Sequence, residues 1–193
     1  GYVAIGLRST PVITSSMVVS NTGRGLYLNW TGLRARNCLV ADNGGDGIYI
    51  IDDNTGPSSW IDYCTIAGNG GAGYNDSGHP LHETTWFTNC IISGNAGYGV
   101  QRPASPSRND YFAYCCVYSN ALGDFVGGQI SLGSGMITNM PPLFGQNTYD
   151  LSTPSPCVDV AIDIGVTNDI VGTLRPTAGR KPAVGSLFDI GCY

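Results

Sequence analysis

Hydrophobic and polar residues alternate along most of the chain in short runs that recur at a nearly fixed spacing. Each run alternates with a period of two, breaks at Asn and Gly, and then alternates again. This pattern is typical of two short β-strands joined by a turn. Four copies of one segment align without gaps, and a fainter copy, Ser16–Asn21, precedes them; the four are Asn37–Asn43, Tyr63–Asn69, Asn89–Asn95 and Tyr114–Asn120.

The same residue types recur at the same place in every copy. A cysteine stands second, at intervals of 26, 26 and 25 residues, and an asparagine closes each copy. A repeat of 22–26 residues made of short strands cannot bury its apolar face alone, so successive repeats must stack. We therefore predict an all-β fold, a right-handed parallel β-helix (β-solenoid). It has about five coils over residues 1–136 and an irregular capping segment over 137–193, packed on the same solenoid as one structural domain.

The cysteine column comprises Cys38, Cys64, Cys90 and Cys115. Stacked side chains at one coil position are parallel and about 4.8 Å apart, which suits a disulfide poorly. Buried cysteine behaves as a small hydrophobic residue. We expect inert core thiols rather than a metal or redox site. Cys116 points to the opposite face of its strand, where we expect an exposed free thiol.

The asparagine column comprises Asn43, Asn69, Asn95 and Asn120. Each side-chain amide can bond the amide and the turn backbone of the next coil, and so satisfy polar groups that would otherwise be buried without partners. We predict a structural asparagine ladder.

Composition narrows the function classes. The chain has one lysine, one glutamate and 12% charged residues, which excludes a helical bundle. No stretch approaches 18 apolar residues, so we expect no membrane span. A net charge of −5 argues against a nucleic-acid partner.

Two clusters could bind a metal. Asp42 and Asp46 flank a glycine-rich turn whose oxygens suit Ca²⁺, but Asp42 is replaced in the other copies by Gly68, Gly94 and Ser119. His79, His82 and Glu83 offer zinc ligands, but Pro80 places them in a loop that does not fix their geometry. We expect a simple turn and a solvated loop, and no cofactor other than a possible Ca²⁺.

Carboxylates and an arginine fall at nearby coil positions. Asp52 and Asp53 lie fourteen and fifteen residues after their cysteine, and Asp76 and Arg102 lie twelve after theirs. Such a strip could cleave a polysaccharide by acid–base chemistry. Against this, the repeats contain no lysine, and no carboxylate column continues across three coils.

After Met136 the period stops and a series of short motifs follows. They are Pro-Leu-Phe at 142–144, Tyr-Asp-Leu at 149–151, Ser-Pro-Cys-Val-Asp at 155–159, Arg-Pro at 175–176 and Asp-Ile-Gly-Cys-Tyr at 189–193. This series resembles the C-terminal module of secreted bacterial right-handed β-helix proteins of the choice-of-anchor Q type. The resemblance implies a bacterial protein that is secreted or on the cell surface, in which this module closes the end of the solenoid. It does not imply one activity.

Two positions depart from that family, since Cys157 and Cys192 stand where alanine is usual. The paired departure suggests a disulfide, which would close a loop of 36 residues and stabilise by roughly 4 kcal/mol. Asp159, Arg175 and Asp189 would form a buried charge cluster that holds the segment together.

These observations favour a non-catalytic extracellular β-helix module with a structural, adhesive or glycan-contacting role. One alternative is a polysaccharide lyase or glycoside hydrolase of the pectate-lyase-like class. A second is a subunit that stacks end to end into a fibre. Because the first residues already have the pattern of strands, we expect upstream coils, another domain or an identical subunit at the N-terminal rung. Polysaccharide is a further possible partner.

Overall fold

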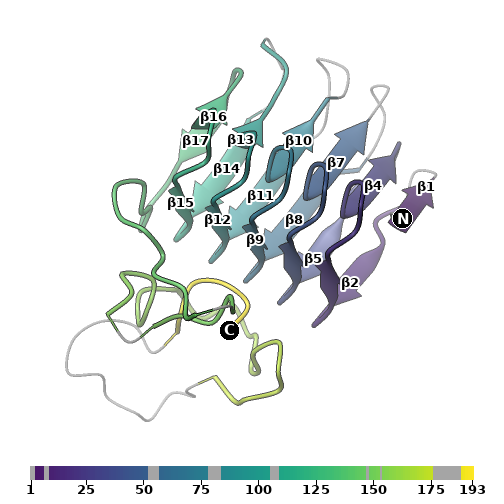
Figure 1. Ribbon diagram of the computed structural model, residues 1–193. Coiled ribbons are helices and arrows are strands. Elements are labelled where there is room, and N and C mark those ends of the chain that lie inside the picture. The colour runs from purple at the N-terminus through teal and green to yellow at the C-terminus, as the bar shows by residue number, and fades with distance from the viewer. Residues whose placement is uncertain are drawn as a thin grey trace.

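The fold is built from three parallel sheets that wrap around one hydrophobic core (Figure 1). The computed structural model describes residues 3–6, 9–51, 57–77, 84–104, 109–146, 148–152, 154–175 and 188–193, with the backbone alone for 3–6. Within these ranges there are seventeen strands and no helix. None of the described segments is therefore a helix that could cross a membrane.

Each sheet collects every third strand of the chain. Sheet A contains β1 (Val3–Gly6), β4 (Leu26–Asn29), β7 (Ile48–Ile51), β10 (Tyr74–Asp76), β13 (Tyr98–Gln101) and β16 (Gly123–Val126). Sheet B contains β2 (Val12–Thr14), β5 (Arg34–Arg36), β8 (Ser59–Asp62), β11 (Thr85–Thr88), β14 (Asp110–Ala113) and β17 (Ile130–Leu132). Sheet C contains β3 (Met17–Val19), β6 (Leu39–Ala41), β9 (Thr65–Ala67), β12 (Ile91–Ser93) and β15 (Cys116–Tyr118).

The strand register follows the repeat. Each strand from β1 to β14 pairs in parallel with the strand three places later, as in Leu39 with Thr65, Thr65 with Ile91, and Ile91 with Cys116. A chain in which each strand pairs in parallel with the equivalent strand of the next coil is a β-solenoid. The predicted fold, an all-β right-handed parallel β-helix, is confirmed.

Single residues with left-handed backbone conformation form the corners between sheets. Asn37, Tyr63, Asn89 and Tyr114, each with φ between 49° and 58°, join sheet B to sheet C. A residue with a side chain rarely adopts this conformation, and here it redirects the chain between two strands without a longer loop.

The cysteines follow these corners directly. Cys38, Cys64, Cys90 and Cys115 share the buried core in neighbouring coils, and each thiol donates to the carbonyl two residues earlier at 3.2–3.3 Å. The recurrent cysteine thus fills a small core position and also satisfies the carbonyl that precedes the corner. Burial raises the pKa of the Cys90 thiol well above its ordinary value and so disfavours the thiolate, which is the reactive form.

The predicted asparagine ladder is confirmed. Asn43 donates from its Nδ2 to Asn69 Oδ1 at 2.9 Å, Asn69 to Asn95 Oδ1 at 2.9 Å, and Asn95 to Asn120 Oδ1 at 2.8 Å. Asn21 of the faint first copy extends the ladder by one coil toward the N-terminus, because its Nδ2 donates to Asn43 Oδ1. Every one of the four predicted amides is buried.

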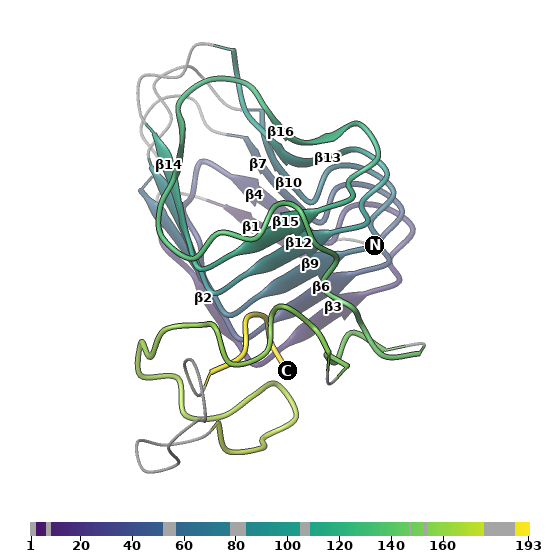
Figure 2. The ribbon, with the colours of Figure 1, turned by 90° about the vertical axis from the view of Figure 1, so that its left-hand side faces the viewer.

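The C-terminal segment lies along the side of the solenoid rather than over its end. Residues 137–146, 148–152, 154–175 and 188–193 pass beneath sheet C (Figures 1 and 2). Cys192 N–H donates to Thr65 Oγ1 at 3.2 Å, and Gly191 N–H donates to the Asn89 carbonyl at 2.8 Å. The outward column Leu39, Thr65, Ile91 and Cys116 is almost entirely buried beneath it. The expectation of an end closure was therefore wrong for most of the segment, because the segment removes this largely apolar outward column of sheet C from water.

The disulfide expected between Cys157 and Cys192 is not present. All seven cysteines lie in the described part of the chain, and all seven are buried free thiols. Cys192 packs with Leu39 and Ala41, whereas Cys157 packs with Cys116. Cys192 lies at Thr65 and Cys157 lies near Cys116, and these two positions of sheet C are two coils apart. Two coils span about 10 Å, which is beyond the reach of a disulfide. Cys116 itself is fully buried, so the expectation of an exposed thiol was also wrong.

The expected charge cluster has a different composition. Arg175 lies over the Tyr63 ring, with its guanidinium carbon 4.2 Å from the ring centroid, and donates to Asn37 Oδ1 and to the Gly191 carbonyl. Asp189 accepts instead from the Asp159 backbone N–H at 2.8 Å. Arg175 therefore fastens the segment to a corner of the solenoid through neutral acceptors and a ring.

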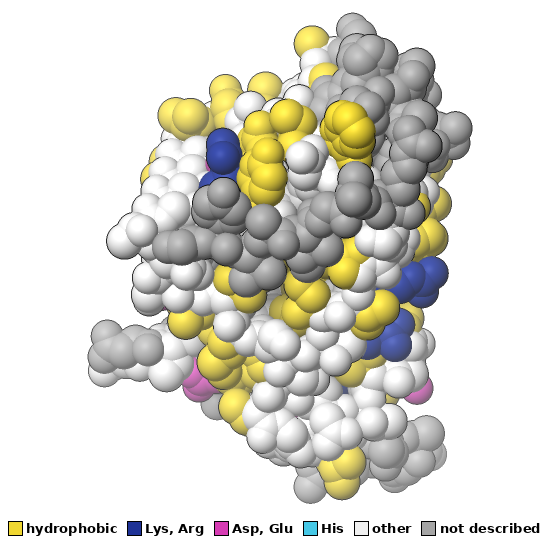
Figure 3. Space-filling model, turned by 90° about the vertical axis from the view of Figure 1, so that its right-hand side faces the viewer, with side chains coloured by type: hydrophobic (Ala, Val, Ile, Leu, Met, Phe, Trp, Pro, Cys, Tyr) yellow, Lys and Arg dark blue, Asp and Glu magenta, His cyan; other side chains and the backbone are white. Residues whose placement is uncertain are grey.

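The N-terminal end presents strand edges and apolar surface. β1, β2 and β3 each stand at the edge of their sheet, and Figure 3 shows hydrophobic side chains at the surface of this end. The exposed large hydrophobic residues of the first coil are Val12, Met17 and Val19.

Candidate functional site

Two of the four candidate catalytic residues lie together in the interior. Asp76 ends β10 and Arg102 follows β13, and Arg102 donates from Nε and Nη2 to Asp76 Oδ2, both at 3.4 Å. Arg102 Nε also lies 3.2 Å from Asp110 Oδ2. These three side chains have no exposed surface. Asp52 and Asp53 lie outside the described residues, as do His79, His82 and Glu83.

Asp110 is the member of this cluster that sequence reasoning missed. It directly precedes Tyr111, the register partner of Trp86, and therefore lies beside Thr85, which pairs in turn with Ser59. Asp110 Oδ1 accepts from the Thr85 N–H at 2.8 Å, just as Ser59 Oγ accepts from the Leu33 N–H at 3.0 Å. The signal was available, because Ser59, Thr85 and Asp110 each lie five residues before a repeat cysteine.

The charge balance of the cluster is uneven, with one guanidinium against two carboxylates. Burial raises the pKa of Asp110 to about 7, although the nearby Arg102 acts to lower it. Oδ2 of Asp110 accepts no hydrogen bond from the described residues. A side chain without exposed surface cannot contact a polymer on the outside, so in this structure the cluster links coils inside the core.

The two candidate calcium ligands have separate partners. Asp42 is exposed and accepts from the Tyr149 hydroxyl at 2.6 Å. Asp46 accepts from Arg24 Nε at 3.1 Å, from the Ala72 N–H at 2.8 Å and from Asn75 Nδ2 at 3.3 Å. Across the described ranges, no three or more Asp, Glu, His or Cys side chains gather as metal ligands.

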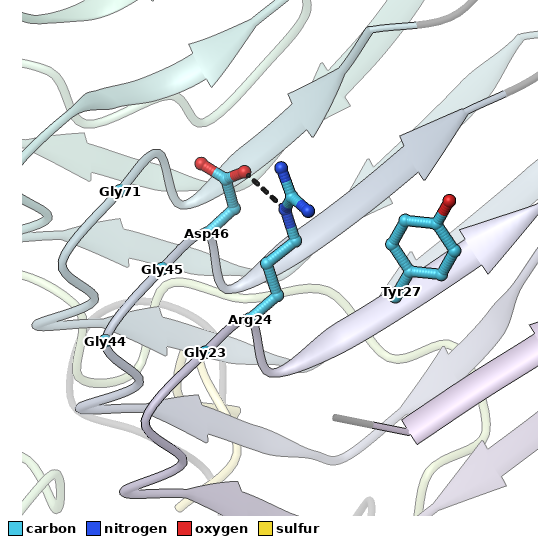
Figure 4. A pocket seen from close by; sticks show the side chains of 7 residues that line it. All are labelled: Gly23, Arg24, Tyr27, Gly44, Gly45, Asp46 and Gly71. Carbon is cyan, nitrogen blue, oxygen red and sulfur yellow. Dashed lines mark hydrogen bonds and ion pairs between the residues drawn. The ribbon is translucent and has the colours of Figure 1, made fainter. Parts of the chain in front are cut away.

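A surface hollow surrounds Arg24, at the turns that lead into sheet A (Figure 4). It has a volume of about 620 Å³. We call it the Arg24 pocket; its lining residues are Gly23, Arg24, Tyr27, Gly44, Gly45, Asp46 and Gly71. Glycine keeps the turns close, since a Cβ on Gly71 would collide with the Asp46 carboxylate.

Arg24 is held in place from two sides. Its Nε donates to Asp46, and its guanidinium carbon lies 3.7 Å from the centroid of the Tyr49 ring. Tyr49 stacks in turn on Tyr27, with 5.5 Å between the ring centroids and 11° between the planes. The two Nη nitrogens extend beyond the carboxylate (Figure 4), and no described residue accepts a hydrogen bond from them. The pocket thus offers two fixed cationic donors to solvent.

Sequence reasoning missed the Arg24 pocket, although its spacing was visible. Arg24 and Asp46 are 22 residues apart, as are Tyr27 and Tyr49. This is the interval between the faint first copy and the next one, so it places each pair in adjacent coils. The faint copy has no cysteine, so the cysteine column does not reveal this spacing.

An aromatic row runs along the outer face of sheet B. Trp60 stacks on Trp86 at 5.1 Å and Trp86 on Tyr111 at 6.2 Å, with planes within 13°. Arg34 covers the other face of Trp60, its guanidinium carbon 4.3 Å from the ring. Because most ring faces cover one another, the row presents ring edges to solvent. It stabilises the sheet through cross-strand stacking, and it offers a ligand less aromatic surface than the ring count suggests.

Comparison with known proteins agrees with the geometry. The chain matches the family described as "Right handed beta helix region" over residues 24–139, which is more than half of its length. The comparisons with curated proteins and with solved structures gave no match. The matched residues cover the coils that carry the cysteine column, the asparagine ladder and the Arg24 pocket. The chain therefore belongs to the right-handed β-helix family.

Proposed function

We propose that this protein is a non-catalytic, extracellular or cell-surface β-helix module that contacts a glycan through the Arg24 pocket. The observation that carries the proposal is the Arg24 guanidinium, which Asp46 and Tyr49 hold beside an open hollow and whose two Nη nitrogens donate to no described residue. The extracellular assignment is supported by the C-terminal motifs and their resemblance to secreted proteins.

The chemistry of the pocket suits a sugar. Sugar hydroxyl and carboxylate oxygens accept hydrogen bonds, and a guanidinium presents donors in a fixed planar arrangement. Asp46 and Tyr49 already hold Arg24 in place, so less side-chain freedom is lost on binding. The volume of about 620 Å³ falls within the usual range for small-ligand sites.

A catalytic role finds less support at the same pocket. Hydrolysis of a glycosidic bond usually requires two carboxyl groups on either side of that bond. Asp46 is the one carboxylate among the lining residues, and it already accepts three hydrogen bonds. Asp76 is buried with Arg102. We therefore propose binding without turnover.

Arg24→Gln tests the proposal, and Arg36→Gln is its matched control. Arg36 is exposed to a similar extent and pairs in the same way with Asp62 one coil away, but it lies on sheet B. Binding of polygalacturonate, alginate and dextran is measured by titration calorimetry. Because hydrogen bonds to a charged group are each worth about 1.5–3 kcal/mol, Arg24→Gln should weaken binding by about tenfold or more. Arg36→Gln should leave it unchanged.

The same samples decide the remaining alternatives. Both variants should keep the melting temperature of the parent chain within a few degrees, since exposed ion pairs contribute about 0–1 kcal/mol. Failure to bind any of the three polymers, or equal weakening by both substitutions, contradicts the glycan assignment. Release of unsaturated or reducing sugar ends would show that the protein is an enzyme.

A further inference from the structure

Two cysteines meet where the C-terminal segment covers sheet C. Cys116 belongs to β15 and points outward, in register with Ile91. Cys157 comes from the C-terminal segment, where its carbonyl accepts from the Ile190 N–H at 2.9 Å. Both side chains are fully buried in one apolar cluster that also contains Ile91 and Ile190.

The two thiols pack in the same buried apolar cluster. Interaction with the Cys157 side chain, followed by burial, raises the pKa of the Cys116 thiol. Cys116 Sγ also lies 3.8 Å from the Met140 carbonyl. The pair therefore lies within one closely packed group that joins the last complete coil to the segment beneath it.

We propose that Cys116 and Cys157 are a modification site, at which an oxidising environment joins the solenoid to the C-terminal segment by a disulfide. A low-molecular-weight disulfide such as oxidised glutathione supplies the oxidation. One protein thiolate attacks it, forms a mixed disulfide and releases one glutathione thiolate. The second protein thiol then displaces the remaining glutathione. Two thiols lose two electrons and two protons, and one glutathione disulfide becomes two thiols.

The other cysteines are poorly placed for this reaction. Cys115 is adjacent in sequence to Cys116 but points into the core cluster with Cys90. Cys192 lies over Thr65, two coils away from Cys116. Because both reacting thiols are buried, the bond should form while the segment docks during folding rather than by attack on the finished fold.

The test is to refold the full chain, reduced and denatured, either with reductant or with a mixture of reduced and oxidised glutathione. After alkylation, cleavage before aspartate separates Asp110–Gly123, which contains Cys115 and Cys116, from Asp150–Val158, which contains Cys157. We expect these two peptides joined, with the loss of two hydrogen masses. The oxidised protein should melt about 5–15 °C above the reduced protein.

Cys116→Ala and Cys115→Ala are the matched variants. The cross-link and the rise in melting temperature should persist in Cys115→Ala and disappear in Cys116→Ala. Melting of each variant under reducing conditions shows separately whether it folds. Recovery of Cys157 alkylated, its linkage to Asp189–Tyr193, or a cross-link that survives in Cys116→Ala would overturn the proposal. None of these results bears on glycan binding at the Arg24 pocket.

Discussion

Replacing Arg102 with Met should destabilise the fold by about 3–5 kcal/mol, because it leaves Asp76 and Asp110 buried without their cation. Methionine keeps much of the side-chain volume, so the loss reports charge rather than a cavity. Equilibrium unfolding in urea at pH 8 measures it. A loss below 1 kcal/mol would show that the two carboxylates are hydrated or paired elsewhere, and would contradict the buried cluster.

Asp110→Asn is the matched control for this cluster, and it adds a pH dependence. The folded pKa of Asp110, about 7, lies above its unfolded value near 4, so the folded state binds more protons between these values. Asp110 therefore favours folding at low pH, and its contribution falls as the pH rises from about 4 to 7. Asp110→Asn should remove that slope and recover part of the Arg102→Met loss at pH 8. An unchanged slope would contradict the assignment.

Replacing Asn69 with Ala should cost about 3–5 kcal/mol, because it removes a buried amide from the middle of the ladder. Asn69 Oδ1 accepts from the Asn43 N–H at 3.1 Å and from Asn43 Nδ2 at 2.9 Å. Its Nδ2 donates to the Val40 carbonyl at 3.1 Å and to Asn95 Oδ1 at 2.9 Å. The substitution leaves these partners unsatisfied in the interior.

Asn29→Ala is the control, since Asn29 is exposed at the end of β4 and has no side-chain hydrogen bond within the described residues. It should change the free energy of unfolding by no more than about 0.5 kcal/mol. Similar losses in the two variants would show that the ladder contributes no more than a surface asparagine does.

The fold could be predicted because residue types that recur at the repeat interval identify the positions that stack in neighbouring coils. Cys64 and Asn69 repeat in nearly every coil, and both columns occupy the predicted positions. The same logic could have placed the candidate catalytic residues. Ile50, Asp76 and Arg102 each lie twelve residues after a repeat cysteine. Ile50 and Asp76 pair directly in register, so the apolar member of the column already indicated that it faces the core.

Features that do not repeat could not be read in this way. The path of the C-terminal segment depends on which outward column is apolar enough to attract it, and the sequence does not say which coil each motif will reach. The resemblance therefore pairs Cys157 with Cys192, whereas the fold packs Cys157 in one cluster with Cys116. The Arg24 pocket depends on an interval of 22 residues, shorter than the 25–26 between the repeat cysteines, and on a copy without a cysteine, where the repeat is hardest to follow.

The stacking of coils is the claim on which everything else depends, and one distance tests it. Val12 and Ser131 are 119 residues apart in sequence, yet they are joined through Arg34, Trp60, Trp86 and Tyr111 in five register steps. Five coils at about 4.8 Å each give about 24 Å. Spin labels on Val12→Cys and Ser131→Cys, with the buried native cysteines unreacted, should give one narrow distance near this value by pulsed electron paramagnetic resonance. A broad distribution, or a distance well beyond about 35 Å, would contradict the stacked register.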